Sequence, residues 1–160
     1  TGLRFFTVYG PWGRPDMAPM IFADAIINKK PLKIFNHGHM SRSFTFIDDV
    51  IEVIINLIHK PARADKSFNT ENPKSSTSWC PSRIFNIGSD KSVKLMDFIS
   101  TLERELGIEA KKEFLPVAEG DVIDTLSDNK EISDWIGTYP KTSLNDGIKL
   151  FVEWYKNYYC

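Results

Sequence analysis

The segment Leu3–Asp16 constrains the fold of this chain more than any other part. Its first half, which ends at Tyr9, is rich in aromatic and β-branched residues and predicts a strand. Its second half, Gly10–Pro15, cannot continue that strand, because glycine permits unusual backbone angles and proline lacks an N–H donor. Such a break is typical of a ligand crevice in an open α/β sheet, where Thr7, Tyr9 and Arg14 would supply polar groups. A core strand that leads into a surface loop has the same pattern.

The rest of the chain alternates between strand and helix patterns, which predicts the α/β fold class. The expected helices are 16–30, 50–59, 94–106, 129–136 and a last helix that Ser143 caps, and the expected strands are 32–35, 42–47, 83–87, 111–115 and 122–126. Gly107 and Gly137 are expected to end the third and fourth helices. Helices 16–30 and 50–59 each show one narrow polar stripe, so both are expected to be packed on most sides.

Length and charge limit the partners of the chain. Its 160 residues suit one domain or a large piece of one, and its formal net charge of −1 offers no general attraction to nucleic acid or to an anionic membrane. No apolar run approaches the ~20 residues that span a bilayer, and the amino terminus shows no signal-peptide pattern. We therefore expect a cytoplasmic protein without a nucleic-acid or membrane partner. The missing initiator Met suggests a piece of a longer chain.

The remaining motifs predict no metal site and one long loop. Cys80 and Cys160 lack metal-ligand spacing and are expected to be free thiols in a reducing compartment, with a disulfide as the alternative. His37 and His39 could ligate a metal, but no third ligand lies nearby, which favours a solvent-exposed turn. Segment 61–83 is dominated by Pro, Ser, Thr, Asn and Lys, so it is expected to be a flexible loop or, alternatively, a flap over a substrate.

Four sequence blocks carry a resemblance to a known family. In chain order they are Leu3–Asp16, Arg42–Asp49 (Arg-Ser-Phe-Thr-Phe-Ile-Asp-Asp), Phe85–Gly88 (Phe-Asn-Ile-Gly) and Gly120–Val122 (Gly-Asp-Val). They resemble the UDP-glucuronate 4-epimerases, including bacterial capsule-type nucleotide-sugar epimerases. These enzymes belong to the extended short-chain dehydrogenase/reductase superfamily, the NAD-dependent epimerases and dehydratases. The resemblance covers nearly the whole chain but only the carboxyl-terminal half of such an enzyme.

The resemblance implies an architecture and a set of partners. The fold class would be the last strands of an extended Rossmann-type sheet plus the small substrate-binding subdomain. In that division, 1–9 and 83–107 are the last strands and helix of the Rossmann sheet, 10–60 and 108–160 form the substrate-binding subdomain, and 61–82 is a flexible loop. The resemblance also implies NAD as cofactor, a UDP-sugar as substrate and a homodimeric whole enzyme.

Candidate site residues follow from chemistry and from the resemblance. Guanidinium groups bind diphosphates bidentately, and Arg14 and Arg42 both lie at expected strand–loop junctions, although an exposed arginine is the alternative for each. The resemblance implies that Arg42 holds the diphosphate and that Arg14 faces the sugar nucleotide. It also implies these contacts: Thr7 with the hexose carboxylate, the backbone of Lys33, Ile34 and Phe35 with uracil, Asp121 with the ribose hydroxyls and Phe6 near the nicotinamide.

Two positions depart from the family pattern. Ser43 stands where an acid usually follows the block arginine, and Ala118–Glu119 replaces the usual Gln-Pro before Gly-Asp-Val. The second departure affects part of the ribose recognition. A carboxylate at Glu119 close to a diphosphate would be unfavourable unless it pointed to solvent, because like charges repel.

The catalytic signature of the family is missing from these residues. The chain contains neither a Gly-rich dinucleotide fingerprint after a strand nor a Tyr-x-x-x-Lys pair. In the family, that Tyr takes the proton from the hydroxyl on carbon 4, the Lys lowers its pKa and NAD accepts the hydride. We therefore expect no catalytic residue in this chain and most of the NAD site upstream of Thr1.

The expected function is the substrate-binding part of an NAD-dependent 4-epimerase of polysaccharide biosynthesis. The resemblance implies that the enzyme interconverts UDP-glucuronate and UDP-galacturonate through a 4-keto intermediate, and that the chain alone is inactive. The alternatives are a related nucleotide-sugar dehydratase or decarboxylase, or a non-catalytic domain that binds a nucleotide sugar.

Overall fold

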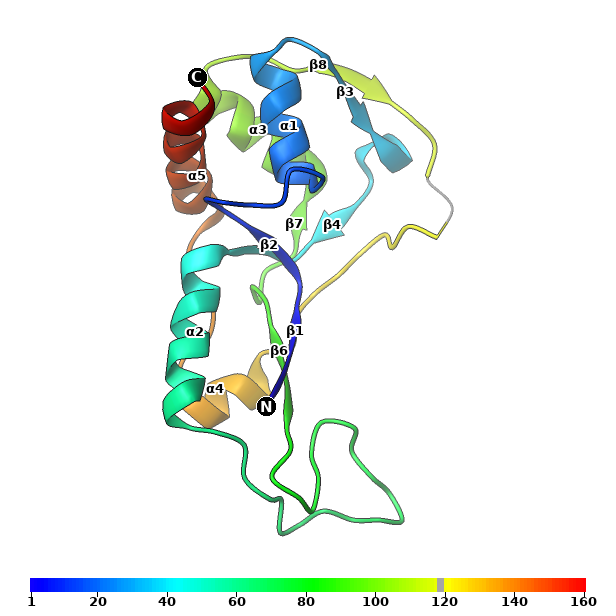
Figure 1. Ribbon diagram of the computed structural model, residues 1–160. Helices are drawn as coiled ribbons and strands as arrows, with labels where there is room; N and C mark the ends of the chain where they lie inside the picture. Colours follow the sequence, from blue (N-terminus) through cyan, green and yellow to red (C-terminus); the bar gives the residue numbers. More distant parts are fainter. Residues whose placement is uncertain (118–119) are drawn as a thin grey trace.

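The computed structural model describes residues 1–117 and 120–160 (Figure 1). Its helices are α1 (Ala18–Ile27), α2 (Ile47–His59), α3 (Leu95–Leu106), α4 (Lys130–Ile136) and α5 (Leu144–Tyr159), with a short 3-10 helix η1 (Phe35–Gly38). Its strands are β1 (Gly2–Phe5), β2 (Thr7–Tyr9), β3 (Pro31–Ile34), β4 (Ser41–Arg42), β5 (Phe44–Phe46), β6 (Ile84–Ile87), β7 (Val93–Lys94) and β8 (Lys111–Phe114). In the described ranges, β1–β6, β2–β5 and β3–β8 pair in parallel, and β4–β7 pair antiparallel.

Two apolar clusters hold these elements together. The larger cluster lies among α1, α3, α5, β3 and β5, and edge-to-face or stacked aromatic rings of Tyr9, Phe44, Phe46 and Phe98 contribute to it. The smaller cluster lies where α2 and α4 pack on β6, in the lower part of Figure 1. Helix α3 thus packs with α1 and α5. The expected division into Rossmann strands and a substrate-binding subdomain stays a prediction.

Each of the two strands expected to carry site residues is split in two. The strand expected over Leu3–Tyr9 breaks at Phe6, whose N–H donates to Ile87 O at 3.3 Å while its own carbonyl accepts from Val8 N at 2.9 Å. The strand expected over 42–47 breaks at Ser43, whose N–H donates to the Thr125 hydroxyl at 3.4 Å and whose buried hydroxyl donates to Ser89 O at 2.7 Å. The breaks let the chain leave one strand pair and join the next. They place Thr7 and Arg42 at adjoining strand ends.

The prediction that the helix after Asp49 is packed on most sides is wrong. Helix α2 begins three residues earlier, at Ile47, and buries only Val50, Val53 and Leu57. Because β6 and α4 cover a single face of α2, other apolar side chains stay exposed, namely those of Ile51, Ile55 and Ile58. By contrast, α1 is mostly buried, as its narrow polar stripe predicts.

The prediction of a strand over 122–126 is also wrong. This segment makes only an isolated bridge, between Asp124 and Ser41. Its backbone bonds go to that one serine, since Ser41 N donates to Ile123 O at 3.0 Å and Thr125 N donates to Ser41 O at 3.2 Å. Its large apolar side chains are exposed, so no core packing extends the pairing. The segment is a strap across β4.

The other local predictions agree with the structure within a few residues. Gly107 and Gly137 end α3 and α4 in the left-handed conformation, with φ of 71° and 82°. The Ser143 hydroxyl caps α5 by accepting from Asp146 N at 3.2 Å. Segment 61–83 contains no helix or strand beyond one isolated bridge, and its flexibility stays a prediction.

Three smaller findings bear on partners. Both cysteines are free. In 1–117 and 120–160, no three His, Cys, Asp or Glu side chains gather closely enough to hold a metal ion. No helix in those same ranges combines the length and apolar character needed to cross a bilayer.

Candidate functional site

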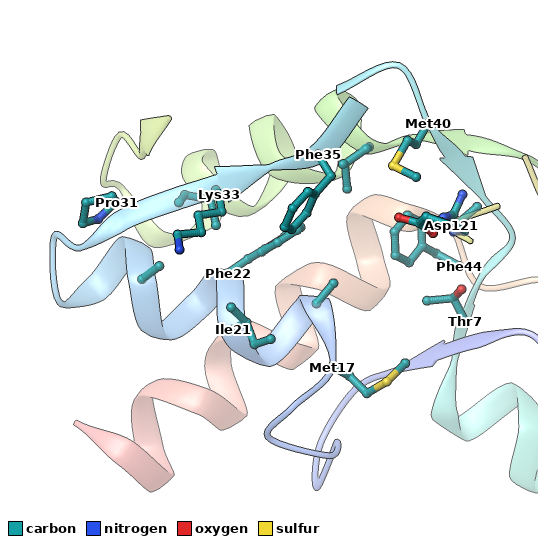
Figure 2. Close-up of a pocket in the computed structure, with 15 residues that line it drawn as sticks. Thr7, Met17, Ile21, Phe22, Pro31, Lys33, Phe35, Met40, Phe44 and Asp121 are labelled. Carbon is teal, nitrogen blue, oxygen red and sulfur yellow. Dashed lines mark hydrogen bonds and ion pairs between the residues drawn. The ribbon is translucent and has the colours of Figure 1, made fainter. Parts of the chain in front are cut away.

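A cavity of about 480 Å³ opens between α1, β3, β5 and the start of the strap (Figure 2). Its two ends differ in chemistry. Thr7, Arg42 and Asp121 lie at one end, and Lys33 lies toward the other. The rest of the lining is mostly apolar, chiefly the side chains of Met17, Ile21, Phe22, Phe35, Met40 and Phe44, of which Met40 and Phe44 lie beside Asp121. A concave, mostly apolar space with a few polar groups is typical of a small-molecule site.

Two segments supply the apolar wall, namely the start of α1 and the turn that follows β3. Helix α1 follows the Gly/Pro loop directly, so its first turns bring Met17 and Ile21 to the cavity. Beyond β3, the chain turns through η1 with left-handed residues at Asn36 and His37, which leaves Phe35 over the opening. An aromatic ring facing an aliphatic helix face can enclose a flat heterocycle.

Arg42 organises the polar end. Its Nη1 donates to Ser41 O at 2.9 Å and to Ile123 O at 2.8 Å, and its Nη2 donates to Asp121 Oδ1 at 3.0 Å. Only 19% of the Arg42 side chain is exposed, against 35% for Asp121. Among the described residues, these bonds use three of the five guanidinium N–H groups. The remaining donors can bind an anion that enters the cavity.

The strap brings Asp121 to this end of the cavity. Besides the backbone bonds to Ser41, the Ser41 hydroxyl donates to Asp124, and Ser43 N donates to Thr125 Oγ1 at 3.4 Å. These bonds join positions about 80 residues apart in the sequence. Among the described residues, the charged side chains that line the cavity are those of Lys33, Arg42 and Asp121, a set with an excess of positive charge that suits an anionic ligand.

The structure brings together five of the eight predicted site residues. Thr7, Lys33, Phe35, Arg42 and Asp121 all line the same cavity. Their individual contacts with a ligand stay predictions.

The side chains of the other three predicted residues are absent from the cavity lining. The Ile34 side chain is fully buried in the core, because successive side chains of β3 alternate between the two faces, and its carbonyl accepts from Leu115 N at 2.8 Å. The contact expected of Ile34 is made by its backbone, between the lining residues Lys33 and Phe35, and stays a prediction. Phe6 is half-buried against Gly88, where an added Cβ would come within 2.8 Å of the Phe6 ring. Arg14 is exposed and lies outside the cavity lining.

Arg14 pairs with its near neighbour Asp16. Its Nε lies 3.1 Å from Asp16 Oδ1, and its Nη2 lies 2.5 Å from Asp16 Oδ2. The hydrogen bond from Arg14 holds the pKa of the Asp16 carboxyl below its usual value. This pair sits on the surface of the loop that leads to Met17, which does line the cavity.

Sequence reasoning missed the apolar wall of the cavity. Met17, Met20 and Phe22 all fit a core helix by composition, and only Met20 among them is absent from the cavity lining. The signal that could have found the wall is position, since α1 starts directly after a crevice loop. The Ala118–Glu119 departure lies outside the described residues.

Comparisons with known proteins place the chain in context. The sequence model of the NAD dependent epimerase/dehydratase family matches residues 1–88. Protein CapI of Staphylococcus aureus is 43% identical over 159 residues, which cover 99% of this chain and 48% of that protein. A probable UDP-glucuronate 4-epimerase of Rhizobium meliloti is 42% identical over 160 residues, covering 99% of this chain and 47% of that protein.

Solved structures agree with the sequence matches. UDP-glucuronic acid 4-epimerase from Bacillus cereus, in complex with UDP-glucuronic acid and NAD, superposes with a TM-score of 0.79 at 32% identity, covering 98% of this chain and 45% of that one. MoeE5 in complex with UDP-glucuronic acid and NAD gives a TM-score of 0.77 at 26% identity, covering 97% of this chain and 46% of that one. The chain spans about half the length of these proteins. The expected fold class, part of a Rossmann-type epimerase fold, is confirmed.

Proposed function

This chain belongs to the NAD dependent epimerase/dehydratase family, and we propose that its cavity binds the UDP-sugar substrate of a 4-epimerase. The longer protein would interconvert UDP-glucuronate and UDP-galacturonate through a 4-keto intermediate. Two similar proteins named for UDP-glucuronate 4-epimerase activity support this choice, from Rhizobium meliloti and Bacillus cereus. CapI, at 43% identity, is in keeping with a role in capsule-type polysaccharide synthesis.

The observation that carries the proposal is the set of chemical groups that the cavity brings together. A UDP-sugar presents a flat base, a ribose, a diphosphate and a hexose. The cavity presents an apolar slot under Phe35 and, at its polar end, a carboxylate at Asp121, the guanidinium of Arg42 that pairs with it and a hydroxyl at Thr7. Each group of the ligand thus meets a partner of suitable chemistry, with Asp121 toward the ribose hydroxyls and Arg42 toward the diphosphate.

Recognition at Arg42 would be an exchange of partners. The guanidinium keeps its bonds to Ser41 O and Ile123 O, which fix its plane, while the diphosphate takes the donors that remain or that Asp121 gives up. The two carbonyl bonds preorganise the side chain, so less conformational entropy is lost when the ligand binds. A hydrogen bond to a charged group of this kind contributes about 1.5–3 kcal/mol.

The described residues do not form a dinucleotide site. No Gly-rich fingerprint follows a strand, and Phe6, expected near the nicotinamide, packs against Gly88 at the end of β6. We propose that NAD is bound mainly by residues outside these 160, with Phe6 at the edge of that site. Without a Tyr-x-x-x-Lys pair, the chain alone is expected to show no turnover. The homodimeric state and the cytoplasmic location stay predictions.

Calorimetric titration of this chain with UDP tests the proposed binding site. Arg42→Ala is expected to weaken UDP binding about tenfold or more, because it removes charge-assisted donors from a mostly buried position. Arg104→Ala is the matched control, since Arg104 lies on the exposed side of α3 and pairs with Glu105 and Asn145. Equal loss in both variants, or no UDP binding by the wild-type chain, would count against the proposal.

The reaction is tested on a longer protein that contains this chain. With UDP-glucuronate and NAD, chromatography of the products is expected to show UDP-galacturonate. A dehydrated or decarboxylated sugar nucleotide as the main product would instead assign the protein to the sister reactions.

A further inference from the structure

The loop between β2 and α1 joins two parts of the cavity wall. Thr7 lies before the loop on β2, and Met17 and Ala18 lie directly after it, and all three line the cavity. Figure 2 shows Thr7 and Met17 near each other at the same end of the cavity. The path of the loop, Gly10–Asp16, therefore sets how far apart these two wall residues stand.

Trp12, in the middle of this loop, has an unusual backbone. Its φ is +61°, in the left-handed region that bulky side chains avoid. The residue is also 71% exposed, so burial in the core does not hold it in place. A strained conformation of this kind persists only where surrounding contacts determine it.

Aromatic contacts supply that constraint. The Trp12 ring centroid lies 4.8 Å from that of Tyr158 in an edge-to-face arrangement and 5.5 Å from that of Trp154. The Trp154 and Tyr158 rings stack on each other at 5.7 Å with an interplanar angle of 15°. Both partners belong to the last turns of α5, so Trp12 joins the loop to that helix.

Helix α5 is a rigid anchor for the loop. Ile148 and Phe151 are fully buried, and Tyr155 is nearly so, in the larger apolar cluster. Near its start, Gly147 lies directly against the Tyr9 side chain, at the end of β2. The helix thus holds the strand before the loop at one end and the loop itself at the other.

Backbone hydrogen bonds couple the loop to the start of α1. Arg14 O accepts from Met17 N at 3.1 Å, and Met17 O accepts from the N–H groups of Met20 and Ile21 at 3.0 Å. At the other side, Gly10 with φ of +138° has no room for a side chain, since a Cβ would come within 2.5 Å of Ile47. The start of the loop is thereby fixed by backbone packing, and Trp12 holds its middle.

We propose that Trp12 is a positioning residue for the ligand cavity. By clamping onto Trp154 and Tyr158, it holds the Gly10–Asp16 loop so that Thr7 and Met17 stand at the correct separation for a bound UDP-sugar. The proposal rests on the proposed function for its ligand. The clamp itself is a property of the unliganded chain and is tested separately.

The first test measures amide hydrogen exchange in the chain by NMR. Trp12→Ala is expected to speed exchange at Met17 N–H about tenfold, because the loop loses its anchor, whereas Trp12→Phe keeps it within about twofold. Tyr158→Ala is expected to act like Trp12→Ala, and the double variant to add little to either. Trp79→Ala is the control, since Trp79 is similarly exposed, at 70%, and lies in segment 61–83. Unchanged exchange at Met17 in Trp12→Ala would overturn the clamp.

The second test measures UDP affinity by calorimetry on the same variants. Trp12→Ala is expected to weaken binding about fivefold and Trp12→Phe to restore it, while the melting temperature changes little. Faster exchange with unchanged affinity would overturn the positioning role. If the wild-type chain binds no UDP, or Arg42→Ala binds it normally, the proposed function fails, and the exchange data still decide the clamp.

Discussion

The Arg42–Asp121 and Arg14–Asp16 pairs place the same two chemical groups in opposite settings. Arg42 and Asp121 are 79 residues apart, lie 3.0 Å from each other, and are 19% and 35% exposed. Arg14 and Asp16 are two residues apart, lie 2.5 Å from each other, and are 73% and 63% exposed. The shorter contact is the more local and the more exposed one.

This difference shows that distance does not rank ion pairs by their importance. An exposed pair is solvated in the folded and the unfolded chain alike, and neighbours in sequence meet in both. The Arg42 pair exists only when the strap lies on β4, so it reports the assembled cavity. Within the described ranges, the Arg14 side chain bonds to Asp16 alone, and its contact with a ligand stays a prediction.

Strand β2, which carries the cavity residue Thr7, ends at Tyr9, and Tyr9 packs closely against Gly147 of α5. Gly147→Ala would disrupt this packing. A Cβ at Gly147 would overlap the Tyr9 hydroxyl and lie 2.9 Å from its ring carbon Cζ. Because Tyr9 is almost fully buried, its side chain has no solvent to move into, and the same burial raises the pKa of its hydroxyl. We expect a loss of about 3 kcal/mol in the free energy of unfolding.

Urea unfolding of Gly147→Ala and of Gly147→Ala with Tyr9→Phe checks this prediction. Removing the hydroxyl is expected to recover part of the loss, because it removes the nearest atom. Gly137→Ala, at a glycine with φ of +82° and nothing within 4 Å of an added Cβ, shows the cost of backbone strain without crowding, whereas Gly147 lies in α5 and has no positive φ. Unchanged stability in Gly147→Ala, or no recovery on adding Tyr9→Phe, would show that crowding against the Tyr9 hydroxyl is unimportant.

The two arginines are compared directly by alanine substitution. Arg42→Ala is expected to lower the free energy of unfolding by about 2 kcal/mol, since it leaves Asp121 without its cationic partner and removes one of the two hydrogen bonds to Ile123 O. Arg14→Ala is expected to leave stability unchanged within error. Thermal melts of the two variants measured side by side check this prediction. A larger loss of stability in Arg14→Ala than in Arg42→Ala would contradict it.

Sequence reasoning could not separate these arginines. Both stand where a strand expected from composition gives way to a loop, and the partners that distinguish Arg42 lie on a strap about 80 residues away. The strap was itself predicted as a strand, because an exposed segment of β-branched residues with one bridge has the composition of a paired strand.

Other parts of the site were within reach of sequence rules. Alternation along β3 predicts that the Lys33 side chain points outward and the Ile34 side chain inward, whereas the family resemblance grouped the two residues by their backbone. The apolar wall was harder, because a cavity face and a core face of α1 have the same composition. Sequence reasoning also missed that three isoleucines of α2 are exposed. A helix apolar on most sides predicts burial, and nothing in the described ranges covers that face.

The smallest expected effect is the loss of the Arg14–Asp16 ion pair at low pH. The hydrogen bond from Arg14 lowers the pKa of Asp16, so the pair contributes above the carboxyl's ordinary pKa and is lost as pH falls through the lowered value in the folded chain. NMR titration of the Asp16 carboxyl is expected to show this lowered pKa, and Arg14→Ala to return it toward the ordinary value. The stability of the chain should barely change over the same range, because both groups are exposed. An acid transition of the whole fold that tracked Asp16 would show that the loop pair is as structural as the buried one.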